Sequence, residues 1–401
     1  MTPSQTASAP EELIFHLAAH SGKPAIPLVF QGDLVKVGQL IAKADGHDSA
    51  NIHSSISGEV KSLSDYPHPN GFNLPSIIIK NDHKNTKVPF IPLKSIKGTS
   101  KEELIQRIFD AGIVEMDGSM IPTHLKFNSQ KKVNEIIING AECEPYLTCD
   151  NRLMVEQTKY IFLGIDILLE ILKPSKVYIA VQDNKPEAIY ALRNYGIRYK
   201  NVKIVTLPTR YPIGADKVLV RYITKNRSSK LPHELGVLVF SMASTAQIGL
   251  SVTTGSPLTE RLVTLSGDLI DKKMNIRVKL GTPIKHLLSE LTEEKAAKHN
   301  PFRIILGGPL TGLSQHNTDV PIMKNTSGLL VLKEQSEPEQ DCIRCGRCID
   351  CCPMFLIPTL VIKNAVQIEE CIECGACSYH CPSKINLVSQ IHNLKNSKDN
   401  S

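Results

Sequence analysis

The sequence contains no tryptophan, and aromatic residues make up only 5% of its 401 positions. Proteins that bind nucleic acid rely on stacked aromatic side chains or on dense basic patches. Here the 46 basic residues are scattered, and the formal net charge is only +6. We therefore expect no nucleic-acid partner and interpret most basic residues as a solvated surface.

Long apolar runs are also missing. A membrane-spanning helix needs about 20 mostly apolar residues, and the best candidate, residues 161–172, is interrupted by Asp166 and Glu170. The first residues include Glu11 and Glu12 and lack the basic-then-apolar pattern of a secretory signal. Any membrane association is therefore expected to be peripheral, and the free thiols favour the reducing cytoplasm.

Cysteine, in contrast, is concentrated in one region. Eight of the 11 cysteines form two copies of C-x2-C-x2-C-x3-C-P near the C-terminus. This is the spacing of bacterial ferredoxins with two [4Fe–4S] clusters, where each loop lends its fourth cysteine to the other cluster. We expect one cluster at Cys342, Cys345, Cys348 and Cys381, and the other at Cys352, Cys371, Cys374 and Cys377.

Two other uses of these cysteines fit the spacing less well. Structural zinc sites usually pair two CxxC knuckles or add histidines at wider separations. Disulfide frameworks are typical of short secreted chains. Cys351 lies one position outside the repeat and is interpreted as a bystander thiol, while Cys143 and Cys149 are interpreted as small buried residues.

The residue pattern predicts a multidomain α/β protein. Between residues 100 and 255, apolar strands alternate with helical segments, which is typical of a largely parallel sheet. The expected divisions are a flexible lead over 1–22, a β-rich domain over 23–90, an α/β domain over 91–256, a small α+β domain over 257–333, a cluster domain over 334–390 and a tail over 391–401.

The short strands of residues 23–90 resemble the barrel-sandwich domain of lipoyl and biotinyl carriers. Those carriers hold their cofactor on a lysine at a hairpin tip. The expected tip here, residues 45–51, has no lysine. We therefore expect this domain to be structural or to serve in docking.

Three further segments narrow the class of protein. They read NGAECEPYLTCDNRLM at 139–154, GGPLTG at 307–312 and TSGLLVL at 326–332. With the tandem cysteine motif, they resemble the C subunit of the Rnf (Rsx) electron-transport complex over residues 25–390. The resemblance implies an α/β domain similar to the flavin- and NADH-binding subunit of complex I, followed by a β-grasp-like domain.

The resemblance also implies a function. Family members lie peripherally on the cytoplasmic face of the bacterial inner membrane, pass electrons from NADH through FMN to two [4Fe–4S] clusters, and have membrane-embedded partner subunits that couple this flow to ion translocation. Candidate flavin contacts retained here, which would equally serve as core hydrogen-bonding residues, are Gly118, Lys126, Asn139, Glu142 and Glu144.

The flavin loop departs from the family pattern GxGGAGFPT. Residues 115–123 read EMDGSMIPT, so only Gly118 remains of four glycines. Glycine lets the backbone approach a phosphate, whereas a carboxylate such as Glu115 or Asp117 repels it by about 1 to 4 kcal/mol at about 4 Å. Residues 213–216 read IGAD in place of QGGE, and Phe240-Ser241 replaces Gln-Asn. These departures argue against ordinary FMN and NADH binding.

Three functions stay open at this point. The favoured one is an electron-transfer subunit of an ion-translocating oxidoreductase, a translocase whose own NADH and FMN site is altered. The second is a non-catalytic electron wire or assembly scaffold that has lost both ligands. The third is a soluble flavoprotein similar to a corrinoid reductase, for which a working flavin loop would be expected.

Overall fold

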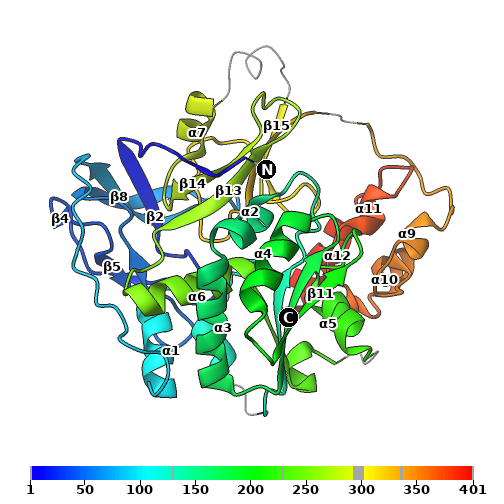
Figure 1. Cartoon of the computed structure of the whole chain (residues 1–401). Helices are drawn as coiled ribbons and strands as arrows, with labels where there is room; N and C mark the ends of the chain where they lie inside the picture. The colour runs from blue at the N-terminus through cyan, green and yellow to red at the C-terminus, as the bar shows by residue number, and fades with distance from the viewer. Residues whose placement is uncertain (1, 129–130, 227–229, 292–301, 335–336, 400–401) are drawn as a thin grey trace.

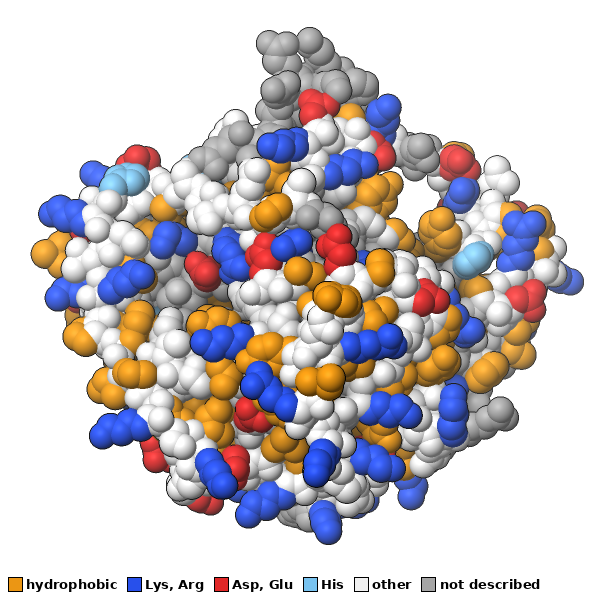
Figure 2. Space-filling view, viewed as in Figure 1, with side chains coloured by type: hydrophobic (Ala, Val, Ile, Leu, Met, Phe, Trp, Pro, Cys, Tyr) orange, Lys and Arg blue, Asp and Glu red, His pale blue; other side chains and the backbone are white. Residues whose placement is uncertain are grey.

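The computed structural model describes residues 2–128, 131–226, 230–291, 302–334 and 337–399. Figure 1 shows a blue β-rich region at the left, a green α/β region in the centre, a yellow region above it and an orange-to-red region at the right. Basic side chains are spread over the face seen in Figure 2. Within the described residues, no helix combines the length and apolarity that crossing a bilayer requires.

Two small antiparallel sheets, with strand orders β2-β8-β7-β4 and β3-β5-β6, form the N-terminal barrel sandwich. Their apolar residues alternate along the strands, so that Ile77 and Ile79 share a core with Leu13 and Ile41. The strands are β2 (Glu12–His16), β3 (Ile26–Pro27), β4 (Leu34–Val35), β5 (Leu40–Lys43), β6 (Ile52–His53), β7 (Gly58–Pro67) and β8 (Asn73–Asn81).

The expectation of a flexible lead over residues 1–22 is wrong. Strand β1 (Gln5–Thr6) pairs in parallel with β14 (Met274–Lys279), and β2 pairs with β8 along its whole length. Leu13, Ile14 and Phe15 are buried. The segment is ordered because its hydrogen-bonding partners lie far along the chain, where local composition gives no signal.

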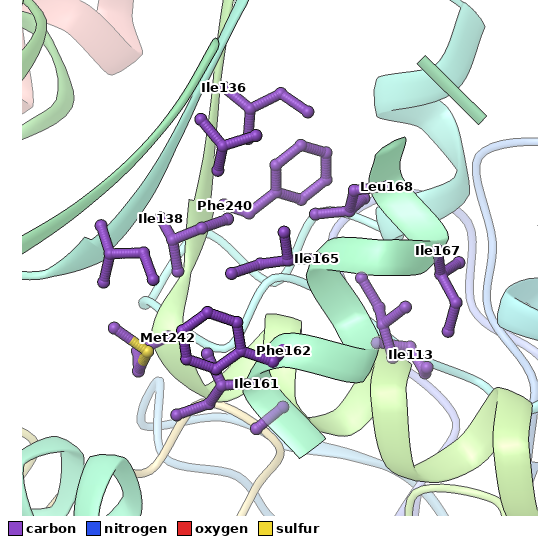
Figure 3. Packing of buried hydrophobic residues seen from close by; sticks show 14 of the residues in the cluster. Ile113, Ile136, Ile138, Ile161, Phe162, Ile165, Ile167, Leu168, Phe240 and Met242 are labelled. Atoms are coloured by element: carbon purple, nitrogen blue, oxygen red, sulfur yellow. The ribbon is translucent and has the colours of Figure 1, made fainter. Parts of the chain in front are cut away.

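A four-stranded parallel sheet of order β11-β10-β9-β12 forms the α/β region. Ile136 and Ile138 face helices on one side, whereas Ile137 faces α5 on the other. Figure 3 shows Ile165 of α3 beside Ile138 and Phe240 of the sheet. The elements are α1 (Lys101–Asp110), η1 (Thr123–Asn128), β9 (Glu135–Gly140), α2 (Cys149–Glu156), α3 (Thr158–Leu172), β10 (Lys176–Gln182), α4 (Pro186–Gly196), β11 (Val202–Leu207), α5 (Asp216–Thr224), η2 (Pro232–Leu235), β12 (Val237–Ser241) and α6 (Met242–Thr254).

The third region has β-grasp topology, as expected. Leaving aside the added edge strand β1, the sheet order is β14-β13-β17-β15-β16, and only the central β13–β17 pair among these strands is parallel. Its elements, with β14 given above, are β13 (Glu260–Ser266), α7 (Ile284–Leu291), β15 (Phe302–Leu306), β16 (Leu313–Gln315) and β17 (Gly328–Lys333).

The C-terminal region repeats one short unit. Gly346 and Gly375 have φ values of +79° and +73° and precede the one-turn helices α9 and α11. The tail expected over 391–401 is wrong for its described part, because Ile391 is 1% exposed within a helix that packs on this region. The helices are α9 (Arg347–Asp350), α10 (Pro358–Asn364), η3 (Ile368–Glu370), α11 (Ala376–Tyr379) and α12 (Leu387–Asp399).

Candidate functional site

The carboxyl ends of the parallel strands meet at one edge of the α/β sheet. Asn139, the last residue but one of β9, lies in register with Ser241, which ends β12. Ligands of parallel α/β sheets bind outside this edge, because the connecting loops leave a crevice there. The loop at residues 115–123 lies at the same edge, where Ser241 donates its N–H to the Glu115 carboxylate at 3.2 Å.

A backbone hydrogen bond closes the loop at residues 115–123, the altered loop. The N–H of Glu115 donates to the carbonyl of Ile121 at 2.8 Å. Gly118 has φ +116°, and no atom lies within 4 Å of the position that a Cβ would take. Glycine is therefore favoured here by the backbone angle and not by a close neighbour within the chain.

Glu115 points into the protein and pairs with Lys126. Its side chain is 0% exposed, and its Oε2 lies 3.0 Å from Lys126 Nζ. Lys126 also donates to the Val239 carbonyl at 2.5 Å. Burial lowers the pKa of Lys126, but the carboxylates of Glu115, Asp117 and Asp216 outweigh this and raise the pKa overall. The ammonium is charged, and groups of the chain itself satisfy it.

A cavity of about 690 Å³ lies beside this loop, which is within the usual range for small-molecule sites. Its walls come from the altered loop, the ends of β9 and β12, the loop after β15 and the C-terminal region. Of the five candidate flavin contacts, it brings together Gly118, Asn139, Glu142 and Glu144. Lys126 does not line it.

Internal hydrogen bonds already engage the three polar candidates in the wall. Asn139 donates to the Gly214 carbonyl at 2.8 Å. Glu142 pairs with Lys185 at 2.9 Å. Glu144 accepts from the Thr311 hydroxyl at 2.6 Å, which ties the α/β region to the β-grasp region. These residues therefore have structural roles whether or not a ligand is bound.

The cavity wall is acidic. Besides Glu142 and Glu144, it contains Asp117, Asp150 and Asp216. Burial, followed by the charge of Glu142, raises the pKa of Asp150 to about 7. Burial raises the pKa of Asp216 to about 6. These raised pKa values leave part of the wall protonated near neutral pH, and a phosphate placed here would meet the like charges of the carboxylates that stay ionised.

Arg261 is the one lysine or arginine among the described residues of this wall, and the protein already uses it. Its guanidinium donates to the Met116 carbonyl at 2.8 Å and to the Lys324 carbonyl. The lining therefore does not fit the phosphate of FMN or NADH. The sequence predicted that both carboxylates of the loop would repel a phosphate. In the structure only Asp117 faces the cavity, whereas Glu115 is buried and forms an ion pair with Lys126.

The structure gathers the second cysteine quartet around one small enclosed space. Its wall includes all four predicted ligands, Cys352, Cys371, Cys374 and Cys377. Cys352 comes from the first run, so this placement supports the exchange of fourth cysteines between the runs. The backbone N–H groups of Leu356 and Glu373 donate to the sulfurs of Cys352 and Cys371, both at 3.4 Å.

The first quartet is more open to solvent. Cys342 and Cys345 are exposed, and Cys348 and Cys381 are partly buried. Burial raises the pKa of Cys348, and the nearby thiols of Cys345, Cys342 and Cys381 raise it further. Within the described residues, no three His, Cys, Asp or Glu side chains lie close enough to hold a single metal ion. A four-iron cluster is bulkier than a single ion and takes its four thiolates at wider spacing.

One residue joins the two sites and was missed in the sequence. Tyr211 lines the acidic cavity and donates its hydroxyl to the carbonyl of Cys374. Cys374 itself also lines that cavity. The second quartet therefore lies next to the cavity, and the first lies farther toward solvent. The contact joins segments far apart in the sequence, so no local signal could reveal it.

This combination defines a modular iron–sulfur protein built on a flavoprotein fold. Three domain families match the sequence: the RnfC barrel sandwich hybrid domain over residues 1–84, the Nuo51 FMN-binding domain over 108–250 and the 4Fe-4S dicluster domain over 335–382. An NAD+-reducing [NiFe]-hydrogenase in the air-oxidized state superimposes with a TM-score of 0.52 at 11% identity, over 78% of this chain and 67% of that chain. At that identity the match shows the fold alone.

Comparison of sequences finds relatives with a higher identity than this structure has. The chain is 39% identical to the C subunit of the proton-translocating ferredoxin:NAD(+) oxidoreductase complex of Clostridium ljungdahlii, over 90% of this chain and 79% of that protein. It is 35% identical to the C subunit of the Na(+)-translocating ferredoxin:NAD(+) oxidoreductase complex of Acetobacterium woodii, over 87% and 80%. The chain belongs to this family, the C subunits of Rnf-type ion-translocating oxidoreductase complexes.

Proposed function

We propose that this chain is the peripheral electron-transfer subunit of a membrane-bound Rnf-type complex, on the cytoplasmic face of the bacterial inner membrane. Its partners would be the other subunits of that complex, which couple electron flow to ion translocation. The observation that carries the proposal is the pair of cysteine quartets, one beside the acidic cavity and one toward solvent. This order suits a relay between an interior site and a partner protein.

The predicted ligands are Cys342, Cys345, Cys348 and Cys381 for the first cluster and Cys352, Cys371, Cys374 and Cys377 for the second. A bound [4Fe–4S] cluster accepts and releases one electron at a time. The chain holds the thiolates in place, donates N–H groups to the sulfurs of Cys352 and Cys371, and surrounds the second quartet with apolar residues. Such hydrogen bonds and exclusion of water set the potential of a cluster.

A second candidate function is an electron wire or scaffold without NADH oxidation of its own. The Glu115–Lys126 pair and the acidic cavity wall favour it over a soluble flavoprotein reductase, which would need a working flavin loop. In this version electrons reach the two clusters from another protein. The two versions share the clusters and the membrane complex, and they differ only in how electrons enter.

Anaerobic purification with counts of iron, sulfide and released flavin tests the proposal. About eight irons per chain would support two clusters, and co-purification with membrane subunits would support the complex. Bleaching of the clusters by NADH would show an intact flavin step despite the altered loop. About eight irons without flavin and without a response to NADH would support the wire or scaffold. A chain that binds no iron would overturn the proposal.

A further inference from the structure

A second cavity, of about 790 Å³, lies between α5 and the cluster region. One wall comes from α5 and the segment before it. The other comes from the residues that follow the first cysteine run, including Cys351 and Cys352. Among the described residues, this cavity shares only Tyr211 and Pro212 with the acidic one. It therefore reaches the cysteine quartets from another side.

The charge of this second cavity is opposite to that of the first. Arg210, Arg221 and Lys225 line it, with Asp350 as the one carboxylate among its described residues. Arg210 and Lys225 are exposed to solvent. A surface with this excess of positive charge attracts acidic partners and speeds their encounter at low ionic strength.

Arg221 has an unmet hydrogen-bonding capacity. Its Nη1 donates to the Pro353 carbonyl at 3.5 Å, and its guanidinium lies 5.7 Å from the centre of the Phe355 ring. Its buried Nε–H has no acceptor among the described residues. An unpaired buried donor costs about 1 to 3 kcal/mol. Because this atom is buried, a partner bound at the surface would not reach it, and the side chain would meet a partner through its outer nitrogens.

Phe355 is 82% exposed at the rim of this cavity. The equivalent position of the second repeat is Lys384, and the two have φ values of +60° and +56°. The fold repeats this turn without repeating the aromatic side chain, so the turn itself does not require phenylalanine. Figure 2 shows hydrophobic side chains exposed beside basic ones over the C-terminal region at the right. Aromatic and arginine side chains are typical anchors of protein interfaces.

We propose that the groove formed by Arg210, Arg221, Lys225 and Phe355 docks an acidic protein that carries single electrons. A small anion would use the basic side chains but would leave Phe355 without a partner, whereas a protein surface would use both. Docking here would bring the carrier next to Cys352, a predicted ligand of the second cluster, so that the carrier would exchange electrons with this cluster from the side away from the acidic cavity. The inference rests on the proposed function, because it gives a one-electron carrier a place to meet the clusters.

The test uses the full chain with both clusters loaded and an acidic two-cluster bacterial ferredoxin as the probe. Isothermal titration calorimetry measures the dissociation constant at about 20 mM and about 300 mM salt. We expect binding that weakens by at least about tenfold at the higher salt. Lys225→Glu and Arg210→Glu should each weaken binding by about tenfold at low salt, and Phe355→Ser should weaken it at both salt concentrations.

The matched control is Lys43→Glu. Lys43 is an exposed lysine at the end of β5, which Figure 1 places at the opposite side of the molecule from α9. It makes the same charge change without touching the groove. Circular dichroism and iron content show that each variant is folded and loaded. An equal loss of binding in Lys43→Glu would overturn the docking site, because only overall charge would then matter.

Three other results would also overturn it: no ferredoxin binding by the intact loaded chain, full binding by the groove variants, or displacement of ferredoxin by millimolar inorganic phosphate. A failure of the proposed function would give results that differ from a failure of the docking site. In that case the chain would lack iron, or dithionite would not bleach its clusters, before any partner is added. A chain with about eight irons that dithionite bleaches, but whose groove variants bind ferredoxin normally, refutes the docking site alone.

Discussion

Lys126 Nζ lies 3.0 Å from the carboxylate of Glu115, the first residue of the loop at 115–123. The ion pair holds the Lys126 ammonium against a buried carboxylate, so this ammonium is not available to bind the phosphate of a ligand. Removing one partner of such a pair leaves an uncompensated charge and costs about 3 to 5 kcal/mol. A substitution that frees Lys126 for a ligand is therefore expected to lower the stability of the loop.

Glu115→Gly should make the chain less stable and more responsive to FMN. The variant frees Lys126, so we expect the melting temperature to fall and FMN to restore part of the loss, while riboflavin restores less. Riboflavin lacks only the phosphate, so the difference between the two ligands isolates the charge interaction. Adding Asp117→Gly should increase the FMN effect further, because Asp117 faces the cavity. Thermal melting of each variant, alone and with FMN or riboflavin, measures these changes in melting temperature.

The control for this experiment is Glu115→Gln, which removes the charge but keeps the size of the side chain. If freeing Lys126 is enough, Glu115→Gln should gain an FMN response as well, whereas a loss of stability without that gain would show that FMN also needs the backbone room of glycine. Equal shifts with FMN and riboflavin in every variant would show that the Glu115–Lys126 pair does not control phosphate binding.

Leu13→Ala should destabilise the chain by about 2 to 5 kcal/mol, since the substitution leaves a cavity in a packed core. Leu13 is 0% exposed and lies in β2, within the segment whose composition predicted a flexible lead. Leu34→Ala is the matched control, because Leu34 is 79% exposed and its loss should cost less than about 0.5 kcal/mol. Urea unfolding compares the two, and equal costs would contradict the role given to β2.

Sequence patterns predicted the structural features that depend on residues close together in the chain. Three predicted ligands of each cluster lie within one short loop, so their spacing alone indicates the chemistry. The alternation of strands and helices between residues 100 and 255 predicted the parallel sheet, which the structure confirms. The β-grasp order, by contrast, was expected from the resemblance alone, because strand spacing does not specify which strands pair.

Contacts between distant segments could not be predicted in this way. Strand β2 depends on β8, and the end of α12 is ordered because Ile391 is buried and Lys395 donates to the carbonyl of Cys371 at 2.7 Å. The same limit applies to the site. Sequence predicted that carboxylates replace glycines in the loop, but only the structure shows that Glu115 faces Lys126 and Asp117 faces the cavity.

His53 should make the fold sensitive to acid. Burial, and then the charge of Lys324, lowers the pKa of His53 to about 3. Between that value and the ordinary pKa of about 6.5, the unfolded chain binds the proton and the folded chain does not. Stability is therefore lost as the pH falls through this window. One such group contributes a slope of up to about 1.4 kcal/mol per pH unit.

Urea unfolding of the His53→Gln variant between pH 7 and about 5 tests this titration. We expect the variant to lose less stability than the original chain over that range. His316→Gln, at an exposed histidine, is the matched control, because it makes the same substitution at the surface. If both variants keep the original slope, the acid sensitivity comes from other groups.

Cys352→Ala should remove one cluster and leave the other. Cys352 lies with Cys371, Cys374 and Cys377 around one enclosed space, although it belongs to the first cysteine run. We therefore expect the iron content to fall from about eight to about four per chain. Cys351→Ala is the control, since the neighbouring thiol lies outside the repeat and its loss should leave about eight irons.

Double variants then decide which cluster Cys352 serves. If Cys352 and Cys374 hold the same cluster, replacing both by alanine should cost no more iron than replacing either one. Combining Cys352→Ala with Cys345→Ala should instead remove both clusters, because each substitution disables a different one. Should the Cys352–Cys345 double variant keep about four irons while the Cys352–Cys374 double variant loses all, Cys352 would serve its own run and the exchange of fourth cysteines would be wrong.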